Sequence, residues 1–584
     1  MAETPVNPAV RYEPDERPAL PLALGSGLQA AIVIVAPVVI TVAIVARIAD
    51  QSDAYIAFGA FAALLISGAT TVLQAVRLGR IGSGHVLIMG TSGAFIAVCV
   101  AALREGGPPL MASLIVVSSL VQFALAARLS LLRRIFTPVV SGTVIMLIAA
   151  TVLPIVFETL RETPEGTPEV AAPLVALTTL AVVAAIVLAG STSWRLWAPV
   201  IGIVAGCAVA APFGLYETAS VEDAAWLGAP LGDWPGLDVT PGAGFWTLLP
   251  AFIIVTIVGA VETVGDGIAI QRVSRRRPRA TDFRTVQGAL NADGVGNLLS
   301  GLLGTLPNTT YSSSIAIAEV TGVSARRVGV VIGAVLLALA FLPKLTAILI
   351  AIPAPVAAAY IVVLVGLLFV QGMQLVVRGG LDHRTAAVVG VSFWLGVGFQ
   401  NGWIFPELIE GGIAEVLLGN GMAAGTLVAV LMTVFVELTG PRRRRLRVPL
   451  DGEATARLNE FLAAFAAREH WDGTSTARLA AAGEEALAIL AQQGGPGRQL
   501  AVSARPGERA AEMEFATVLA GENIEDRLAY LGDLPPVPDA GELEREMSLR
   551  LLRHHASTVR HQQYHGADVI TVTVGRGGEG GGEG

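Results

Sequence analysis

The chain has 584 residues, of which 53% are hydrophobic and only 15% are charged, with a net charge of −8. Soluble domains usually carry about 25% charged residues. The apolar residues here are concentrated in runs of about 20, the length that crosses a bilayer. The composition therefore excludes an ordinary soluble protein and predicts a polytopic, all-α membrane protein. Residues 1–20 contain Pro and carboxylates without an apolar core, which indicates a disordered tail rather than a signal peptide.

Fourteen apolar runs are candidate membrane spans within a predicted transporter domain over residues 21–440. Basic residues follow the even-numbered runs and acidic residues follow most of the odd-numbered ones, which predicts that both termini are cytoplasmic. Two cysteines, Cys99 and Cys207, lie in apolar runs and indicate buried thiols. The runs cover residues 24–47, 55–76, 84–103, 109–126, 136–157, 172–190, 195–213, 245–270, 286–304, 308–320, 326–350, 354–376, 385–400 and 421–438.

The third run of each half is short and polar. The first half has GSGHVLIMGTSGAF at residues 82–95, and the second has GTLPNTTYSSS at 304–314. Seven spans per half make the halves inverted repeats, and interrupted spans at equivalent positions are a pointer to a binding site at the midplane. Non-helical backbone is tolerated at that depth only where it is buried in protein or lines a cavity. The alternative is that the Ser and Thr residues only allow close helix packing.

Two carboxylates interrupt the apolar run at 245–270. Glu262 and Asp266 are four residues apart and therefore lie on one helical face. A charge at the bilayer centre is costly, and this run offers no Lys or Arg to compensate for it. We therefore expect Glu262 to carry a proton or to accept N–H groups of a ligand, the alternative being a protonated structural residue. We expect Asp266 to take part in proton coupling with Glu262, the alternative being a residue that caps a helix or pairs with an Arg.

Several long blocks resemble the nucleobase–ascorbate transporters, the family of uracil and xanthine permeases. They cover about residues 20–440 and include SGLQ, TPVVSGTVIMLI, VETVGDG, ADGVGNLLSGLLGTLPNTTY, TGVSARRVG and PKLTAILIAIPAPV. The VETVGD and TGVSARRVG blocks are most similar to the purine branch. The resemblance implies 14 spans as 7+7 inverted repeats with core and gate domains, proton symport, and often a homodimer.

The resemblance also implies roles for individual residues. Glu262 matches the carboxylate that binds nucleobase N–H groups, and Asp266 matches the acidic residue of the same signature. Tyr311 falls where members place an aromatic residue beside the ligand. Ser92, Gly93 and Ala94 match the short extended segment of the third span that faces the ligand in this family.

The sequence departs from the family at three positions. Ser313 stands where members have Gln or Glu, Ser314 stands where they have Asn, and Ala30 replaces a His that follows Leu-Gln. A short hydroxyl cannot make the two-point contact of an amide or carboxylate. We expect Ser313 and Ser314 to line the substrate site still, and these replacements leave the exact substrate open.

The composition changes after the transporter domain. Residues 441–450 indicate a basic linker, 451–575 a cytoplasmic α/β domain, and 576–584 a Gly/Glu-rich tail. LAAAGEEALAIL and MSLRLLRHHASTVRHQQYHGADVITVTV resemble parts of the histidine-kinase-like ATPase domains of anti-sigma factors. Ile489 stands where the Mg²⁺-binding Asn is expected, and no Asp-x-Gly-x-Gly loop follows. A pseudo-ATPase is therefore implied, with an unrelated α/β module as the alternative.

Two histidines of this domain are candidate metal ligands. His561 and His565 share a helical face if the preceding helix continues through them, which permits a metal pair. A solvated helix end is the simpler interpretation of the same pattern.

Together these features predict a secondary active transporter of the cytoplasmic membrane, taking up a nucleobase such as xanthine, urate or uracil with a proton. No nucleophile–base set appears among the spans, so we expect no enzyme activity and no cofactor beyond the proton. Expected partners are the substrate, the bilayer, a second copy of the chain and a cytoplasmic protein, but no nucleic acid. Two alternatives stay open: a transporter of another solute or anion, and a sensor that signals through the C-terminal domain.

Overall fold

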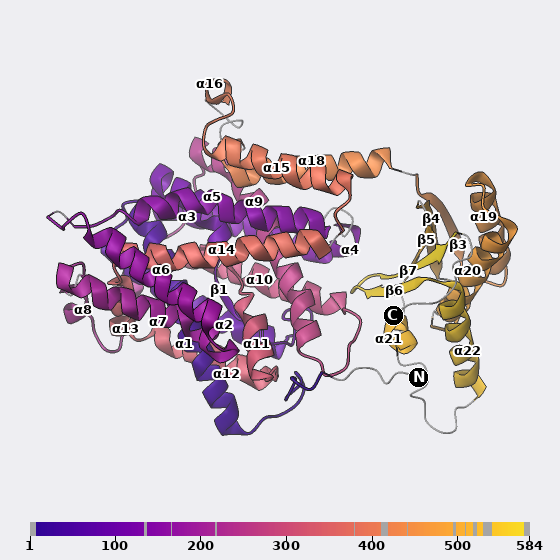
Figure 1. Cartoon of the computed structure of the whole chain (residues 1–584), viewed down its shortest axis with the longest axis horizontal. Helices are drawn as coiled ribbons and strands as arrows, with labels where there is room; N and C mark the ends of the chain where they lie inside the picture. Colours follow the sequence, from indigo (N-terminus) through magenta and orange to yellow (C-terminus); the bar gives the residue numbers. More distant parts are fainter. Residues whose placement is uncertain are drawn as a thin grey trace. The chain divides into compact units, whose positions relative to one another are not determined.

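The computed structural model describes two compact units (Figure 1). The membrane unit comprises Pro8–Ser274 and Thr285–Val434, and the C-terminal unit comprises Met1–Asn7, Arg275–Arg284 and Phe435–Gly584. Within them the structure describes residues 7–132, 137–164, 166–216, 219–378, 380–409, 418–440, 442–493, 498–507, 510–517, 523–529 and 540–576.

Long apolar helices make up most of the membrane unit. Among the described residues, eight helices are long and apolar enough to cross a membrane, and a ninth span results if α12 (Arg326–Ala340) and α13 (Pro343–Ile350), bent by 86°, are counted together. The chain is therefore a multi-pass membrane protein, whereas the count of fourteen spans stays a prediction. The eight are α1 (Leu20–Ile48), α2 (Asp53–Val76), α3 (Ile96–Ala127), α5 (Pro138–Thr159), α6 (Ala171–Ala189), α9 (Ala243–Val273), α14 (Ala354–Arg378) and α18 (Gly421–Thr439).

Further helices, 3₁₀ turns and strands complete this unit. The helices are α4 (Leu129–Leu132), α7 (Thr192–Ala210), α8 (Ala219–Asp223), α10 (Phe283–Leu303), α11 (Ser313–Thr321), α15 (His383–Gln400) and α16 (Pro406–Ile409). Single 3₁₀ turns are η1 (Gly93–Phe95), η2 (Ala211–Phe213) and η3 (Leu231–Asp233), and two strands are β1 (Met89–Thr91) and β2 (Asn308–Thr310). The two interrupted runs found in the sequence thus each become a strand followed by a helix.

The helices of the membrane unit pack in two groups. In the first group α2 packs along α12, α1 along both, and α3 along α9; in the second α5 packs along α14, α6 along α7, and α15 on α5. Glycines allow the closest approaches. A Cβ at Gly68 of α2 would lie 2.7 Å from the Gly333 carbonyl of α12, and one at Gly142 of α5 would lie 2.4 Å from the Gly372 carbonyl of α14. Larger side chains at these crossings would force the helices apart.

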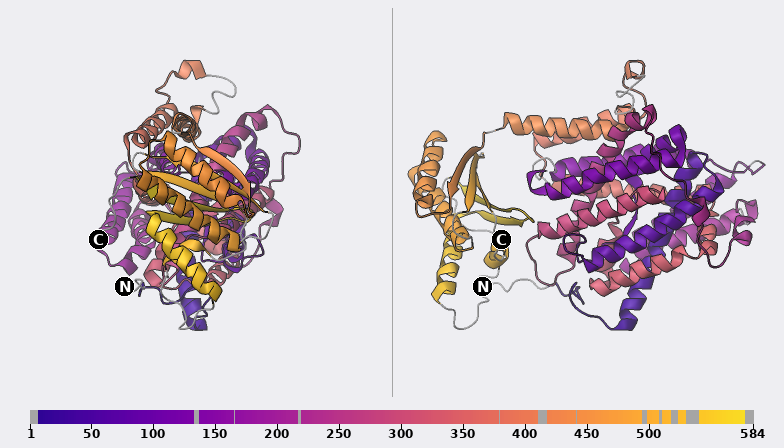
Figure 2. Two further views of the ribbon diagram at one scale, coloured as in Figure 1. Left: turned by 90° about the vertical axis from the view of Figure 1, so that its right-hand side faces the viewer. Right: turned by 180° about the vertical axis from the view of Figure 1, so that it is seen from behind.

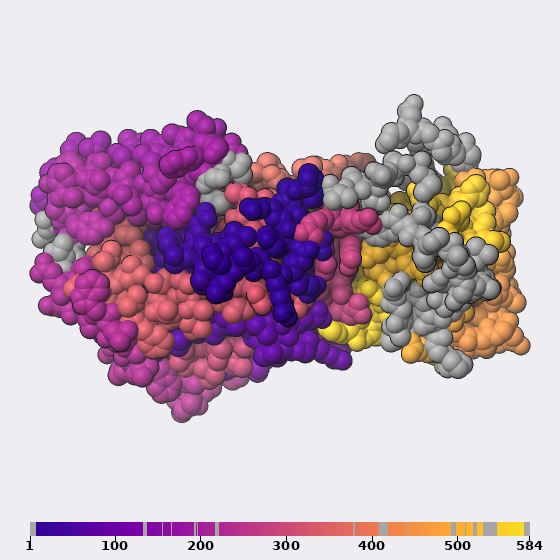
Figure 3. Space-filling view, turned by 90° about the horizontal axis from the view of Figure 1, so that it is seen from below, coloured from indigo at the N-terminus to yellow at the C-terminus, as the bar shows by residue number. Residues whose placement is uncertain are grey.

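The segment before α1 is ordered where the structure describes it, so the prediction of a disordered tail over 1–20 is wrong for this part; residues 1–6 lie outside the described residues. The N–H groups of Arg11 and Tyr12 donate to the Gly322 carbonyl at 2.8 and 3.0 Å, and Arg326 pairs with Asp15 at 2.9 Å. These tertiary contacts with the α11–α12 turn supply the order that the local sequence does not. Figure 3 shows the indigo N-terminal residues on the surface of this unit.

The C-terminal unit is built on a five-stranded antiparallel sheet with strand order β3-β4-β5-β7-β6. Helices α19, α20 and α22 cover one face of it, as the left view of Figure 2 shows. Phe465 of α19, Leu490 of α20 and Phe515 of β5 are fully buried in the core between these layers. The elements are β3 (Arg444–Pro449), α19 (Ala454–Arg468), α20 (Gly473–Gln493), β4 (Gln499–Pro506), β5 (Ala510–Thr517), α21 (Ile524–Ala529), α22 (Ala540–His555), β6 (Thr558–Gln563) and β7 (Asp568–Gly575).

Two expectations for this region differ from the structure. Residues 444–449, within the predicted basic linker 441–450, form the edge strand β3. This strand pairs antiparallel with β4, and exposed side chains alternate with less exposed ones along most of it. His561 lies on strand β6 rather than on a helix, so the shared helical face with His565 does not exist and that basis for a metal pair is wrong. Of the predicted tail 576–584, residues 577–584 lie outside the described part of the chain.

Candidate functional site

β1 and β2 pair antiparallel and bring the two interrupted regions together. The ladder continues on both sides, because Ser92 N–H donates to the Pro307 carbonyl and Tyr311 N–H donates to the Ile88 carbonyl, each at 2.8 Å. Backbone polar groups inside a bilayer have no water to pair with and must find partners in the protein. The pairing therefore explains how non-helical backbone persists in this part of the membrane unit.

Side-chain hydroxyls pair with backbone groups at the edge of this ladder. Ser314 Oγ accepts a hydrogen bond from Ile88 N–H at 2.9 Å and donates to the Tyr311 carbonyl at 2.6 Å. Thr71 Oγ1 accepts from Met89 N–H at 2.9 Å. The structure thus places Ser314, predicted as a ligand-contacting residue, in a buried role that joins the two strands.

A helix begins directly after each strand. Ser92 precedes η1, which contains Gly93 and Ala94 and leads into α3, and Ser313 is the first residue of α11. Helix N-termini present unpaired N–H groups and a positive dipole end. The Oγ atoms of Ser92 and Ser313 are buried and have no hydrogen-bond partner among the described residues. Two hydroxyls and two helix starts thus offer polar contacts to a ligand.

The carboxylates of α9 have different surroundings. Asp266 is buried, and its two oxygens accept hydrogen bonds from Thr310 Oγ1 at 2.8 Å and Ser312 Oγ at 2.7 Å. Glu262, one turn earlier, is half-buried and has no hydrogen-bond partner among the described residues. It lies within electrostatic range of Asp266 and Tyr311. Asp266 therefore fixes β2 and the turn after it, whereas the carboxylate of Glu262 is open to a ligand or a proton.

A third buried carboxylate, Asp293 of α10, was not singled out from the sequence. Its Oδ2 accepts hydrogen bonds from Gln122 Nε2 at 2.5 Å and Thr263 Oγ1 at 2.6 Å. Asn297, one turn later, donates to Gln122 Oε1 at 2.8 Å and accepts from Asn308 N–H at 2.7 Å. Asp293 and Asn297 lie four residues apart in a run predicted to cross the membrane, so they share a helical face. This spacing is the sequence pattern that could have identified them.

The ring of Tyr311 packs against Gly90 of β1. Its hydroxyl donates to the Thr91 carbonyl at 3.0 Å, and only a glycine at position 90 leaves room for its ring. Tyr360 of α14 is fully buried within electrostatic range of Tyr311. The second helix group therefore contributes a residue next to the site, although no pattern in the sequence pointed to this residue.

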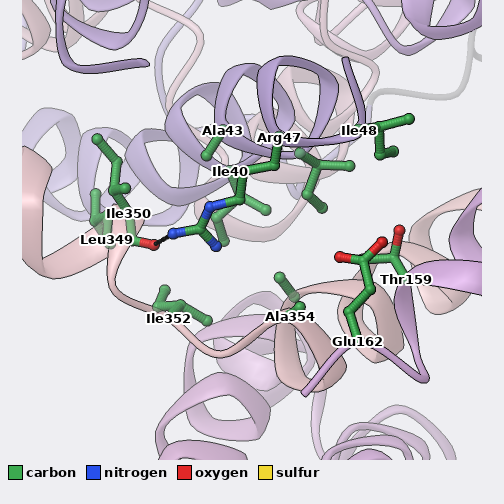
Figure 4. A pocket seen from close by; sticks show the side chains of 12 residues that line it. Ile40, Ala43, Arg47, Ile48, Thr159, Glu162, Leu349, Ile350, Ile352 and Ala354 are labelled. Carbon is green, nitrogen blue, oxygen red and sulfur yellow. Dashed lines mark hydrogen bonds between the residues drawn. The ribbon is translucent and has the colours of Figure 1, made fainter. Parts of the chain in front are cut away.

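A separate hollow lies at the ends of α1 and α5. Arg47 and Glu162 line it together with apolar residues, and Arg47 Nη2 donates to the Ile350 carbonyl at 2.8 Å (Figure 4). It contains none of the predicted site residues. In the part of the chain that the structure describes, no group of three or more His, Cys, Asp or Glu side chains could hold a metal ion.

Comparison with known proteins assigns the family. A family model described as "Permease family" (Xan_ur_permease) matches residues 23–403, which is well over half of the chain. The chain belongs to this permease family. The resemblance found in the sequence is therefore confirmed for the transporter domain, and the protein is a transporter rather than an enzyme. The match ends at residue 403 and does not include residues 451–575, so their resemblance to an ATPase domain stays a prediction.

Relatives cover the same region. The chain is 29% identical over 384 residues to the "Putative purine permease CPE0397" of Clostridium perfringens, covering 64% of this chain and 82% of the relative. It is 25% identical over 452 residues to the "Xanthine permease XanP" of Escherichia coli, covering 73% and 95%. It is 27% identical over 384 residues to the "Uric acid permease PucK" of Bacillus subtilis, covering 65% and 87%.

Proposed function

We propose that this permease is a secondary active transporter that takes up a nucleobase of the xanthine, urate or uracil type together with a proton. The observation that carries the proposal is the half-buried carboxylate of Glu262, which has no described hydrogen-bond partner and lies beside Tyr311. The relatives named as purine, xanthine and uric acid permeases support the choice of substrate class.

In this proposal the carboxyl group of Glu262 accepts an N–H group of the base through one oxygen, and it keeps this acceptor capacity when the other oxygen carries the proton. The Oγ atoms of Ser92 and Ser313 supply further polar contacts, and the backbone of Gly93 and Ala94 lines the site beside them. The ring of Tyr311 flanks the planar base. Ser314 does not touch the ligand in this arrangement, because its hydroxyl is occupied by two backbone groups.

Proton coupling follows from the same carboxylate. A proton on Glu262 neutralises a charge that is costly inside the membrane, so loading and release of the proton and of the base become linked through one group. Asp266 contributes by holding Thr310 and Ser312 in place. The buried network around Asp293 supports the backbone on which the site is built.

The proposed architecture is fourteen spans in two inverted halves of seven, with core and gate domains. The antiparallel pairing of the third runs of the two halves supports the inversion, because equivalent elements related by a two-fold axis meet in this way. We further propose a homodimer in the cytoplasmic membrane with both termini cytoplasmic, following the basic residues after even-numbered runs.

Uptake of radiolabelled xanthine, urate and uracil into vesicles, at two pH values, tests the proposal. Glu262→Gln should abolish proton-coupled uptake while the protein still folds, as judged by thermal unfolding. Glu222→Gln, which removes an exposed carboxylate on α8, is the matched control and should transport normally. Full uptake by Glu262→Gln with unchanged pH dependence would contradict the mechanism. Uptake of anions alone would favour a different substrate, and binding without flux would favour a sensor.

A further inference from the structure

The segment that joins α9 to α10 is rich in arginine. It runs from Arg275 to Arg284, of which the last two residues begin α10, and reads RRRPRATDFR, with five arginines in ten positions. The helix before it carries Glu262 and Asp266, and the helix after it carries Asp293. A protein contact that restrains this segment therefore acts on both helices that supply carboxylates to the site.

Three kinds of contact connect this segment to the C-terminal unit, of which it forms a part. Ala280 N–H donates to Asp526 Oδ1 at 2.5 Å. Arg284 Nη2 donates to Gln563 Oε1 at 3.2 Å. The rings of Phe283 and Tyr564 pack with centroids 5.0 Å apart. A charged acceptor, a polar pair and an aromatic pair thus lie along one stretch of five residues, which indicates a specific docking surface.

Charge complementarity supports the same conclusion. Burial raises the pKa of Asp526, and the nearby positive charges of Arg279 and Arg275 oppose that shift by favouring its carboxylate. Asp526 belongs to α21, and β6 fixes the start of that helix. Ile524 N–H donates to Nδ1 of the buried His561 at 3.0 Å, and the His561 N–H donates to Glu525 Oε2 at 3.0 Å. The acidic surface is therefore held in position by buried contacts of the sheet.

The end of α18 is bound to the same sheet. Glu437 of α18 pairs with Arg443 at 3.5 Å and with Arg505 of β4 at 3.2 Å. Arg443 also pairs with Glu514 and Glu512 of β5, at 2.9 and 3.4 Å. Ion pairs that form a network of this kind are stronger than isolated surface pairs. The C-terminal unit is thus joined both to α18 and to the segment between α9 and α10.

These two attachments belong to different helix groups. α18 packs on α15 of the second group, since a Cβ at Gly421 would lie 2.2 Å from the Gly396 carbonyl, whereas α9 packs on α3 of the first group. Transporters of inverted-repeat architecture work by movement of one such group against the other. A folded domain attached to both restricts that movement.

We propose that the C-terminal unit is a regulatory domain whose α21–β6 surface binds the arginine-rich segment Arg275–Arg284 and thereby slows transport. The effect on the transport rate rests on the proposed transport function. The binding of the segment rests on the contacts alone and can be measured without transport. Any event that frees the segment from Asp526 raises the transport rate, and the substrate site itself is unchanged.

The first experiment compares the full-length wild type with Asp526→Ala in lipid vesicles. Hydrogen bonds to charged groups contribute about 1.5–3 kcal/mol, so amide hydrogen exchange within residues 275–284 should rise by about tenfold or more. The initial uptake rate should rise at least about twofold with an unchanged KM. Glu453→Ala, which removes an exposed carboxylate at the N-cap of α19 whose only ion pair among the described residues is with Arg457, is the matched control and should change neither quantity.

A cross-link provides the converse test. The chain has only two cysteines, Cys99 and Cys207, and Cys99 is fully buried. The double variant Ala280→Cys/Asp526→Cys, joined by a short thiol cross-linker, should transport more slowly than the same variant left unlinked, and the single variants should not respond to the reagent.

The two readouts separate the possible failures. Unchanged exchange in Asp526→Ala overturns the docking contact. Raised exchange with an unchanged uptake rate, or a cross-linked protein that transports at the full rate, overturns the regulatory role. If the wild type moves no nucleobase at all, the proposed substrate is wrong, and the exchange measurement still decides whether the surface binds the segment.

Discussion

Gly90 is the position where the smallest side-chain addition should disturb the site most. A Cβ there would lie 2.4 Å from Cζ, 2.7 Å from Cε2 and 2.8 Å from Oη of Tyr311. The ring must move away, and its hydroxyl loses the 3.0 Å hydrogen bond to the Thr91 carbonyl. Overpacking costs about 1–3 kcal/mol and the lost hydrogen bond about 1 kcal/mol. We therefore expect Gly90→Ala to lower the free energy of unfolding by about 2–4 kcal/mol and to weaken base binding.

Thermal unfolding of the purified full-length protein measures the effect. Gly366→Ala on α14 is the matched control, because a Cβ there meets no atom within 4 Å, and its melting temperature should equal or exceed that of the wild type. In a Tyr311→Ala background the clash is absent, so Gly90→Ala should cost under about 1 kcal/mol. An equal loss in both backgrounds would refute the reasoning, since only residues in contact show such coupling.

Three further predictions concern single side chains. Ser314→Ala should lower the melting temperature, because the Ser314 hydroxyl bridges two backbone groups. Ser313→Ala should leave the melting temperature unchanged and weaken base binding in a titration. A loss of stability in Ser313→Ala and a loss of binding in Ser314→Ala would contradict these roles. Asp293→Ala leaves buried donors without an acceptor, so thermal unfolding should show a stability loss of about 1–3 kcal/mol for each donor. Asp293→Glu should not restore this stability, because its longer side chain cannot keep the same hydrogen-bond geometry. Hydrogen bonds from Thr385 lower the pKa of Asp382, the N-cap of α15, so its carboxylate stabilises the protein above about pH 4 and this contribution is lost as pH falls through the lowered pKa. The gap in melting temperature between wild type and Asp382→Ala should correspond to about 1 kcal/mol at neutral pH and close in acid, and a gap that persists in acid contradicts the assignment.

The location of the site could be predicted because its signals are local. Pro307 followed by hydroxyl residues breaks an apolar run, and Glu262 stands out in another. What could not be predicted is which polar group faces which. Ser313 and Ser314 are adjacent in the sequence, yet one hydroxyl has no described partner and the other joins two strands. That difference depends on the register of β1 against β2, which no local pattern encodes.

Other errors share a cause. Residues 7–19 look disordered because their composition offers no core, but their backbone pairs with the turn at Gly322. His561 looks helical when the preceding helix is continued, but β6 is selected by its pairing with β7. In both cases the partner is distant in the chain. Periodicity reports what a segment prefers alone, and tertiary hydrogen bonds decide the rest.

The pairing of β1 with β2 has a consequence for how the protein is made. Met89 pairs with Thr310, so the two strands are separated by about 220 residues of chain. A ribosome adds about 5–20 residues per second, which means that β1 is synthesised roughly 10–45 s before its partner exists. During this interval its N–H and C=O groups have no ladder, and lipid cannot pair with them. The first half of the chain must therefore keep this segment in a wet or protein-lined environment, and a nascent chain that ends before Asn308 cannot hold the site.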